Sequence, residues 1–432
     1  MTVRRARGLL VVCLAALGCI LILLALAARS GCLPSTVVAG LAISFIPYAG
    51  LLSAATSLRR LPPLGPAALA LLCGAPLLLA PPVLSDDLYR YLWEGRMWIE
   101  GFNPYRLAPE DLALSPLRDE LWANINNPAI GSIYPPFSQL LFVVVAWFGG
   151  QVWMLKLLAL LAHVGTAAFV ARIVRSPRAQ LAIALNPLLL SEAALNGHLD
   201  ILCGLALLVT AWALAQQRYL RASIAVCAAV GLKLVGLAFL PLFARRPKIF
   251  LGTALASLLL LVPLVAARAP ADPVSGAGQF ASRWRGNDSL FALVDWASGL
   301  AFGDASADLA ARAITVLLFF VVCALVVYRR VPSFAAARAL IWSVLLLSPQ
   351  VHPWYLAWLL PLELLAGGSA GFVWSAAILC AYAPLDLWVG QGVWRMPPCL
   401  QAFEYSIVTL ALILDPRRPT LQAQPEDRQF LL

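Results

Sequence analysis

The chain has 432 residues, of which 62% are hydrophobic and only 12% are charged, and its net charge is +10. A soluble globular domain carries about 25% charged residues, so this composition excludes a soluble enzyme and predicts a polytopic membrane protein. Arginines that flank membrane spans on the inner side explain the positive charge better than nucleic-acid binding does.

The cysteines and the short motifs exclude several further classes of protein. The nine cysteines show no CxxC spacing, and most of them lie in apolar runs, where a free thiol behaves as a small hydrophobe. We therefore expect neither a disulfide framework nor a zinc site. The chain also lacks a Walker loop, a dinucleotide-binding fingerprint and an HExxH motif, which leaves a soluble nucleotide substrate unsupported.

Apolar runs that suit membrane helices recur along the whole chain. A spanning helix needs roughly 20 apolar residues, so the length allows roughly 10 to 13 spans. We expect helical runs near residues 9–28, 37–55, 66–84, 152–174, 181–190, 201–214, 220–243, 251–266, 314–328, 335–347, 355–365, 372–385 and 407–414. A further run at 137–148 is too short to cross comfortably.

Four segments follow from this pattern. Residues 1–84 hold the first three spans, and residues 85–136 form one long polar loop. Prolines and asparagines interrupt that loop, so we expect short helices at the membrane interface rather than a span. Residues 137–415 form the rest of a helical bundle, and residues 416–432 form a cytoplasmic tail.

The run at 220–243 is unusual because arginines precede and follow it and Lys233 lies near its middle. If both ends are cytoplasmic, the run is a hairpin of two half-helices, which membranes tolerate only when it is buried in protein. Lys233 itself has two explanations that involve no ligand: it snorkels toward the interface, or it pairs within the hairpin.

Charge fixes the expected orientation. If Arg4, Arg5 and Arg7 lie on the cytoplasmic side of the membrane, the other arginine-rich turns can also lie on that side. The remaining polar clusters then share the outer face. These clusters are Asp86 and Asp87, the long loop, residues 196–200, residues 283–288, His352, and residues 386–395.

Asp86 and Asp87 stand directly after an apolar run, where acid at the mouth of a membrane span is costly. One of them could serve helix capping, since Ser85 or Asp86 precedes a helix expected from Leu88 and an acid there favours the helix dipole. The other suits a general base, because a carboxylate partly shielded from water can accept a proton from a hydroxyl.

Helical spacing places Arg90, Tyr91 and Glu94 on the same face as Asp87. That face offers a base, a cation and a hydrogen-bond donor together. Arg90 equally suits a simple ion pair with Asp86 or Glu94.

Three further clusters each have a functional and a structural explanation. Glu192, His198 and Asp200 suit a substrate-facing group or a polar break between spans. His352, with Tyr355 beside it, suits a hydrogen-bond donor or an aromatic interface belt. Arg283 and Arg285 suit phosphate binding or contact with lipid headgroups, because a guanidinium fork matches phosphate.

The order of these motifs resembles bacterial polyprenol-phosphate-mannose-dependent mannosyltransferases and the related glycosyltransferase family 87, within the GT-C superfamily. The similarity covers most of the chain. Its residues are Asp87-x-Tyr89-Arg90-Tyr91-x-Trp93-Glu94-Gly95-Arg96, Gly101-x-Asn103-Pro104-Tyr105, Tyr134-Pro135-Pro136, Glu192…Asn196-Gly197-His198-x-Asp200, Lys233…Pro241 and His352-Pro353-Trp354-Tyr355. The chain has Glu94 where family members often have Asp, and Leu199-Asp200 where they often have Asn-Asp.

The resemblance implies an all-α GT-C transmembrane bundle with a catalytic acid in an early outer loop of a bacterial cytoplasmic-membrane protein. It also implies a polyprenyl-phosphate sugar donor, an inverting transfer and a glycan or glycolipid acceptor; a divalent metal is left open. Asp87 would be the general base, with Asp86 as its neighbour or substitute. The candidate substrate-binding residues are Arg90, Tyr91, Glu94, Arg96, Asn103, Tyr105, Tyr134, Glu192, His198, Asp200, Arg283, Arg285, His352 and Tyr355.

Two rival hypotheses remain at this stage. Interrupted helices such as the one around residues 192–200 are typical of transporters, so a transporter or a flippase of lipid-linked sugars is the main alternative. A non-catalytic membrane scaffold is the other. Against transport, the polar residues cluster on one expected face instead of at the midplane.

Overall fold

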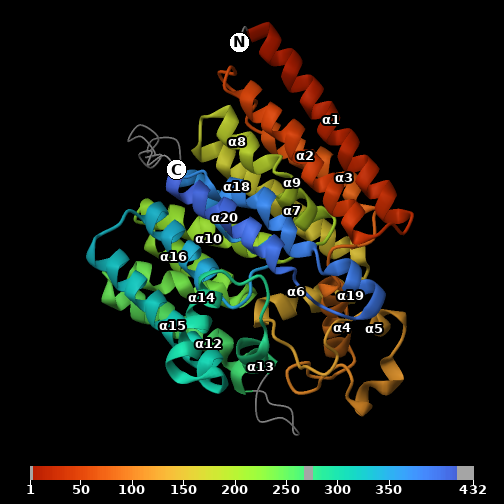
Figure 1. Cartoon of the computed structure of the whole chain (residues 1–432), viewed down its shortest axis with the longest axis vertical. Coiled ribbons are helices and arrows are strands. Elements are labelled where there is room, and N and C mark those ends of the chain that lie inside the picture. Colours follow the sequence, from red (N-terminus) through yellow and green to blue (C-terminus); the bar gives the residue numbers. More distant parts are fainter. Residues whose placement is uncertain (1–2, 267–275, 416–432) are drawn as a thin grey trace. The chain divides into compact units, whose positions relative to one another are not determined.

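The computed structural model describes residues 3–266 and 276–415. Within these residues every regular element is a helix (Figure 1), and the one β-type pairing is an isolated parallel bridge between Gly286 and Gln350. The prediction of an all-α protein is therefore confirmed. The expected tail at 416–432 lies outside the described residues.

The chain forms two compact units. Unit 1 is made from Met1–Val83, Leu157–Gly197 and Leu359–Leu432, and unit 2 from Leu84–Lys156 and His198–Trp358. Two helices, α7 (Val152–Ile173) and α17 (Leu356–Leu365), contain a boundary between the units. The four segments expected from sequence describe sides of a membrane rather than compact units, and they stay predictions.

Unit 1 packs helices from three distant parts of the chain. The Tyr48 hydroxyl of α2 (Pro34–Ala55) donates to the Ala182 carbonyl at 2.8 Å, and Asn186 donates to the Ser375 hydroxyl at 3.0 Å. Besides α2 and parts of α7 and α17, the helices of this unit are α1 (Val3–Arg29), α3 (Gly65–Leu78), α8 (Pro177–Ala184), α9 (Pro187–Ala194), α18 (Ala370–Ala377), η4 (Ile378–Tyr382), α19 (Leu385–Gln391) and α20 (Pro398–Leu414). Figure 1 shows α1 and α2 side by side.

Unit 2 contains the long polar segment and the helices that follow residue 197. Its core includes Trp93 and Met97 from α4, packed with Leu114 and Ile125 of the polar segment. Its helices are α4 (Asp87–Ile99), η1 (Leu112–Leu117), α5 (Glu120–Ala123), α6 (Pro136–Trp147), α10 (Asp200–Ala215), α11 (Tyr219–Leu232), η2 (Leu234–Phe243), α12 (Pro247–Ala266), α13 (Gly276–Arg283), α14 (Leu290–Phe302), α15 (Asp304–Tyr328), α16 (Ser333–Leu347) and η3 (Pro353–Tyr355).

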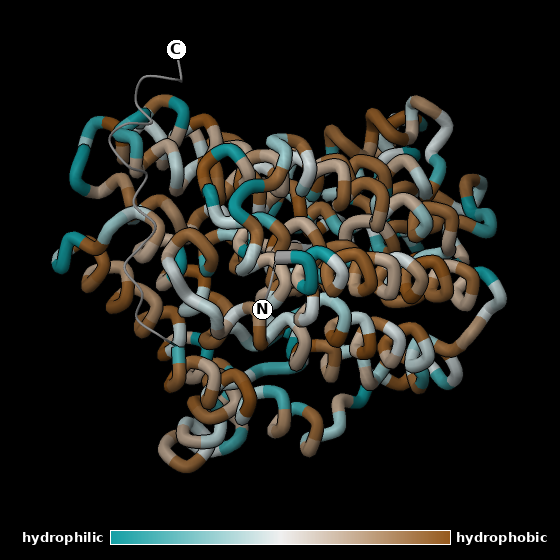
Figure 2. The backbone as a smooth tube through the Cα atoms, turned by 90° about the horizontal axis from the view of Figure 1, so that it is seen from above, coloured by the Kyte–Doolittle hydropathy of each residue, from teal (hydrophilic) through white to brown (hydrophobic). Residues whose placement is uncertain are grey.

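Six of the described helical segments are long and apolar enough to cross a membrane: Arg4–Arg29, Pro34–Ala55, Val152–Ile173, Pro247–Ala266, Asp304–Tyr328 and Ala370–Gln391. Figure 2 shows hydrophobic residues along most helical turns. Large apolar side chains are also exposed on these helices, such as Leu23 of α1 and Leu317 of α15. An exposed apolar surface of this extent suits lipid rather than water, so the protein is a multi-pass membrane protein.

Several expected helices differ in their bounds. The run expected at 66–84 ends at Leu78, before the Pro81-Pro82 pair that disfavours helix. The run at 181–190 is two helices, because the Asn186 side chain caps α9 at Leu189 N and Pro187 opens that helix. The run at 314–328 starts at Asp304, and α14 was not predicted.

The hairpin predicted at 220–243 is present in outline. Helix α11 ends at Leu232, Lys233 is extended with φ −151° and ψ 142°, and the 3₁₀ segment η2 follows and packs back on α11. The Ser138 hydroxyl of α6 donates to the Leu232 carbonyl at 2.7 Å. That bond satisfies a carbonyl that the break would otherwise leave without a partner.

Candidate active site

The candidate site begins at the first turn of α4. The Ser85 hydroxyl accepts a hydrogen bond from the Asp87 backbone N–H at 3.2 Å, while the Asp86 side chain makes no capping bond. Of the two capping residues considered from sequence, Ser85 is therefore the one that fills the role. Both carboxylates are left available for other contacts.

One amide holds the two carboxylates together. Asn126 Nδ2 donates to Asp86 Oδ1 at 2.7 Å and to Asp87 Oδ1 at 2.8 Å. The second oxygen of Asp87 lies 3.4 Å from the Tyr91 hydroxyl, one helical turn away. The Asp87 side chain keeps 18% of its surface exposed. Asp87 is thus a fixed carboxylate that a substrate can still approach.

Two tyrosines stand behind Asp87. The rings of Tyr91 and Tyr134 meet edge to face at 5.0 Å. Burial and then the nearby charge of Asp87 raise the pKa of both phenols well above the usual value. Both hydroxyls therefore remain protonated, and the Tyr91 hydroxyl acts as a hydrogen-bond donor to Asp87.

Two histidines that are distant in sequence meet on one tryptophan. His198 stacks on Trp354 at 4.0 Å between ring centres, and His352 stacks on the same indole at 4.2 Å. His198 Nε2 lies 3.8 Å from Asp87 Oδ2 and 3.1 Å from the Ser85 hydroxyl. The structure therefore brings His198 and His352 into the neighbourhood of Asp87.

His352 is a neutral imidazole. Burial lowers its pKa to about 3, although the charge of Asp87 acts in the opposite direction. Its Nε2 lies 2.5 Å from Gln350 Nε2, which fits an unprotonated ring nitrogen that accepts from the amide. At neutral pH this histidine supplies no positive charge for a phosphate.

A buried ion pair lies close to these groups. Asp200 occupies the first turn of α10, and its Oδ2 lies 3.1 Å from Lys233 Nζ. The ammonium also sits 5.5 Å from the centre of the Tyr134 ring, a cation–π distance. Lys233 is therefore paired, but its partner lies in α10 and not within the 220–243 hairpin, where the sequence analysis expected it.

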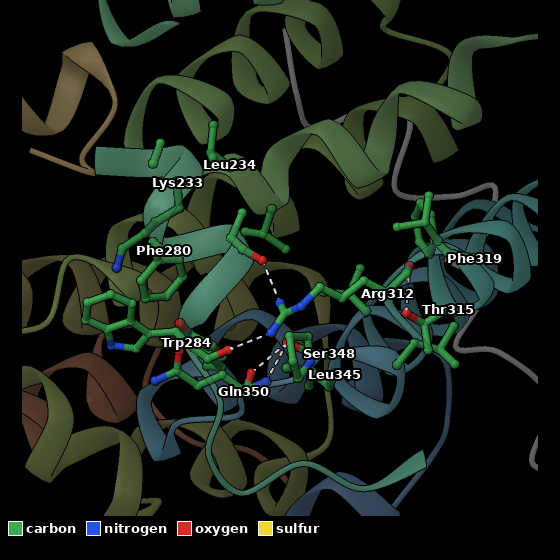
Figure 3. A pocket seen from close by; sticks show the side chains of 18 of the residues that line it. Lys233, Leu234, Phe280, Trp284, Arg312, Thr315, Phe319, Leu345, Ser348 and Gln350 are labelled. Carbon is green, nitrogen blue, oxygen red and sulfur yellow. Dashed lines mark hydrogen bonds between the residues drawn. The ribbon is translucent and has the colours of Figure 1, made fainter. Parts of the chain in front are cut away.

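Lys233 lines a cavity of about 540 Å³ (Figure 3). The walls are mainly apolar and aromatic, with Phe280, Trp284 and Phe319 among them. Tyr355 also lines this cavity. A volume of this size matches small-molecule pockets, which are typically apolar with a few polar groups.

Arg90 and Glu94 form a buried network instead of facing the cavity. Arg90 Nε donates to Glu94 Oε1 at 2.6 Å, and its other nitrogens donate to the carbonyls of Asn126, Asn127 and Ile130. The ion pair considered from sequence is therefore present. Because these carbonyls belong to the same turn as the Asn126 amide, Arg90 fixes the residue that holds Asp87.

Glu94 completes this network on its other oxygen, which accepts from Ser132 at 2.6 Å and from Gln139 at 2.5 Å. Arg96 lies on the solvent-accessible side of α4, and its Nη1 lies 2.5 Å from Asp119 Oδ2. Partial burial raises the pKa of Asp119, but hydrogen bonds from Arg96 and from the backbone outweigh it and lower the pKa.

Asn103 and Tyr105 shape the loop that follows α4. The Asn103 side chain accepts from the Tyr105 N–H at 2.9 Å, and the Tyr105 hydroxyl donates to the Tyr134 carbonyl at 2.9 Å. These contacts order the backbone beside Tyr134. Their predicted roles in substrate binding stay predictions.

The two arginines predicted to bind phosphate have protein partners. Arg285 pairs with Asp288 at 2.9 Å and with Asp295 at 2.7 Å, while Arg283 contacts Gln279 at 3.4 Å. Neither is among the residues that line the cavity. The arginine on the cavity wall is Arg312 of α15, which the sequence did not single out.

Glu192 belongs to unit 1, whereas His198 and Asp200 belong to unit 2. Within unit 1 the Glu192 carboxylate accepts from the Tyr382 hydroxyl and from Asn196 Nδ2, the latter at 3.2 Å. All of its surface is buried. Glu192 is thus described with unit 1, and its predicted role stays a prediction.

Three residues of the site were missed from sequence: Asn126, Lys233 as a cavity residue, and Arg312. Asn126 belongs to the asparagines that the sequence analysis used only as interruptions of the long polar loop, because a turn asparagine has a local explanation. In the described residues, no group of three or more histidine, cysteine, aspartate or glutamate side chains is arranged to hold a metal ion.

The fold and the site define a class: a polytopic membrane protein with a fixed, partly exposed aspartate and, in the same compact unit, an apolar cavity lined by Lys233. The family model for the alpha-(1→6)-mannopyranosyltransferase N-terminal domain matches residues 16–246, which is 231 of the 432 residues. The chain belongs to this mannosyltransferase family, and the resemblance to GT-C enzymes is confirmed. No curated protein and no solved structure matches the chain.

The protein is therefore a membrane hexosyltransferase of the alpha-mannosyltransferase type. The matched region contains Asp87, Asn126, His198, Asp200 and Lys233, and it ends before His352. Family membership does not favour the transporter alternative.

Proposed function

We propose that this protein transfers mannose from a polyprenyl-phosphate donor to a hydroxyl of a glycan or glycolipid at the outer face of the bacterial cytoplasmic membrane. Asp87 is the general base, and Asp86 is its neighbour in the same Asn126 contact. The N-terminus lies in the cytoplasm in this proposal. The lipid-linked donor carries its own leaving group, and a chelator tests whether a divalent ion is also needed.

The geometry of Asp87 carries the proposal. A base must be fixed within reach of the hydroxyl that it deprotonates. Asn126 and Tyr91 fix the carboxylate, and 18% of the side chain stays exposed. The neighbouring acid of α4, Glu94, is fully buried and accepts three hydrogen bonds from protein groups. Asp87 is therefore the better base of the two.

The proposed reaction is a single displacement at the anomeric carbon of mannose. Asp87 takes the proton of the acceptor hydroxyl while that oxygen forms a bond to the anomeric carbon of mannose. The bond between this carbon and the phosphate oxygen breaks, and polyprenyl phosphate leaves with the electron pair. Attack from the side opposite the phosphate inverts the anomeric configuration. Charge develops on the departing phosphate, so cationic and hydrogen-bonding groups near it would supply much of the rate.

The variant Asp87→Asn tests this mechanism in membranes supplied with radiolabelled polyprenyl-phosphate mannose. We expect kcat to fall about 10²- to 10⁴-fold, the usual contribution of a general base. The Asn126 contact can persist in the amide variant, so folding should be retained. Glu120→Gln, an exposed acid of α5 in the same polar segment, is the matched control and should keep full activity.

Asp86→Asn should lower the rate less than Asp87→Asn. A double variant, Asp86→Asn with Asp87→Asn, that still transferred mannose at the wild-type rate would overturn the mechanism. If the wild-type protein does not consume polyprenyl-phosphate mannose, the choice of donor is wrong.

A further inference from the structure

Two cationic side chains line the cavity, Lys233 and Arg312. They differ in how much of their hydrogen-bonding capacity the protein uses. Arg312 donates to Asp308 at 2.6 and 3.2 Å, to the Ala281 carbonyl at 2.6 Å, and to the Trp284 carbonyl at 3.5 Å. Figure 3 shows its guanidinium bonded to backbone oxygens of the cavity wall. Arg312 therefore holds α13 and the following turn against α15.

Lys233 has more unused hydrogen-bonding capacity than Arg312. An ammonium carries three N–H donors, and the described ionic partner of Lys233 is the Asp200 carboxylate, whose Oδ2 lies 3.1 Å from Nζ. The side chain is 16% exposed, and it reaches the cavity from the extended residue between α11 and η2. Its neighbour Tyr134 offers a ring face rather than an acceptor oxygen, at 5.5 Å from the ring centre.

We infer that Lys233 binds the single phosphate of the lipid donor and that Asp200 competes with this phosphate for the same ammonium. The inference rests on the proposed function and adds the residues that set the affinity. Lys233 contacts the phosphate oxygens as an ammonium donor. Asp200 is a positioning residue that orients Lys233 and limits how tightly the anion is held.

The cavity supports the assignment of the ligand class. A lipid that carries one phosphate places its apolar chain against Phe280, Trp284 and Phe319, and its charge at Lys233. The arginines of the 283–288 loop are outside the lining, and Arg285 is already paired with two acids. Neutral His352 adds no charge. Lys233 is thus the cavity cation whose donors are least committed to the protein.

The charge of Asp200 distinguishes a phosphate-binding lysine from a purely structural ion pair, because the two partners should affect phosphate affinity in opposite directions. A carboxylate 3.1 Å from the ammonium repels a phosphate that approaches the same group. Removing Lys233 should therefore weaken binding of the lipid phosphate, while removing the charge of Asp200 should strengthen it. Strong retention of polyprenyl phosphate, the product, would in turn slow turnover.

The experiment measures binding of a polyprenyl phosphate without sugar to the full-length protein in phosphatidylcholine nanodiscs. For Lys233→Gln we expect affinity to fall about 10- to 100-fold, the range for loss of a charged hydrogen bond. Lys233→Arg should keep much of the affinity because the charge remains. Asp200→Asn should bind more tightly than the wild type, with a lower kcat that product release limits. Lys248→Gln, an exposed lysine of α12, is the control and should bind as the wild type does.

A double variant serves as the control for misfolding. Lys233→Gln with Asp200→Asn removes both charges of the ion pair together, which avoids leaving the buried Asp200 carboxylate unpaired. It should fold and bind as weakly as Lys233→Gln. Unchanged affinity in the double variant, or equal weakening by Lys233→Gln and Asp200→Asn, would overturn the inference.

A parallel measurement with phosphatidic acid separates the two sources of a lipid phosphate. Binding of phosphatidic acid as tight as that of the polyprenyl phosphate would assign the site to membrane phospholipid and overturn its role in donor binding. Failure of the proposed function is distinguishable. A protein that binds polyprenyl phosphate through Lys233 but transfers no mannose would refute the transfer and leave the binding site standing.

Discussion

Residue environment separates the two acids of α4 into different roles. Asp87 is partly exposed and shares the Asn126 amide with Asp86, whereas Glu94 is completely buried and neutralises Arg90. A buried charge is stable only when it is paired and hydrogen-bonded. Glu94 therefore stabilises the turn that carries Asn126, and through that turn it preserves the geometry of Asp87.

Glu94→Gln should destabilise the protein strongly. The change leaves Arg90 as a buried, uncompensated charge, which costs about 3–5 kcal/mol. Arg96→Gln is the matched control on the same helix. Its partner Asp119 is 48% exposed, and an exposed pair contributes about 0–1 kcal/mol. Thermal unfolding in detergent should show a much larger fall in midpoint for Glu94→Gln, and equal midpoints would contradict this account.

The sequence identified the acids of the site more readily than their partners. Asp86 and Asp87 stand out because carboxylates are costly at a membrane mouth, and spacing on one helix placed Tyr91 beside Asp87. Asn126 lies 39 residues after Asp87 in the chain. Lys233 and Asp200 are separated by α10, by the turn that leads to α11, and by α11 itself, which ends just before Lys233. Such pairings depend on tertiary packing, which no local pattern in one sequence encodes.

At the scale of elements, α4 and α6 pack unusually closely. The reason is Gly95, whose missing side chain leaves room for the Phe142 carbonyl of α6. Close approach matters for the site because α6 supplies Gln139 to Glu94 and Ser138 to the Leu232 carbonyl. The contact at Gly95 thus connects the helix that bears Asp87 with the break that presents Lys233.

Gly95→Ala should destabilise unit 2, because the new methyl group overlaps a backbone carbonyl that cannot move aside easily. Overpacking of this kind costs about 1–3 kcal/mol. Gly252→Ala is the control in α12, where nothing lies within 4 Å of the added carbon. Urea unfolding in detergent would detect the difference, and equal stability of the two variants would refute the close-packing argument.

Helix positions were predictable from apolar runs, but helix ends and breaks were only partly so. Long helices such as α1 and α2 contain their expected ranges and begin three to six residues earlier, because hydrophobicity and length act together while the polar first turn carries no apolar signal. The break before α9 was missed, because a buried Asn186-Pro187 step reads as part of a continuous apolar run. Helix α14 was missed since it follows directly on a polar turn.

At the scale of the whole molecule, the apolar faces of the long helices require a bilayer, and the arginines predict which way the chain crosses it. The proposed orientation places the polar segment 85–136 outside and the turn after α15 inside. Proposed catalysis at Asp87 depends on this orientation, because the acceptor must reach the same side of the membrane.

Leu112→Cys and Arg329→Cys test the orientation. Leu112 is 83% exposed in the polar segment, and Arg329 is exposed at the end of α15. A membrane-impermeant maleimide should label Leu112→Cys in intact cells above the background of the native cysteines, and should label Arg329→Cys only after lysis. The reverse pattern would place the candidate site in the cytoplasm.

The break at Lys233 also bears on how the chain is made. A lysine at a helix centre costs only about 2.5–3.5 kcal/mol during insertion, so the segment from α11 through η2 can first enter the bilayer as one hydrophobic unit. Folding then has to open it, and the Leu232 carbonyl needs the Ser138 hydroxyl when it does. Because α6 precedes α11 in the chain, this partner has already been synthesised when the segment leaves the ribosome. Synthesis of the proposed donor site is thereby ordered in time: α6 is made before the lysine that lines the cavity.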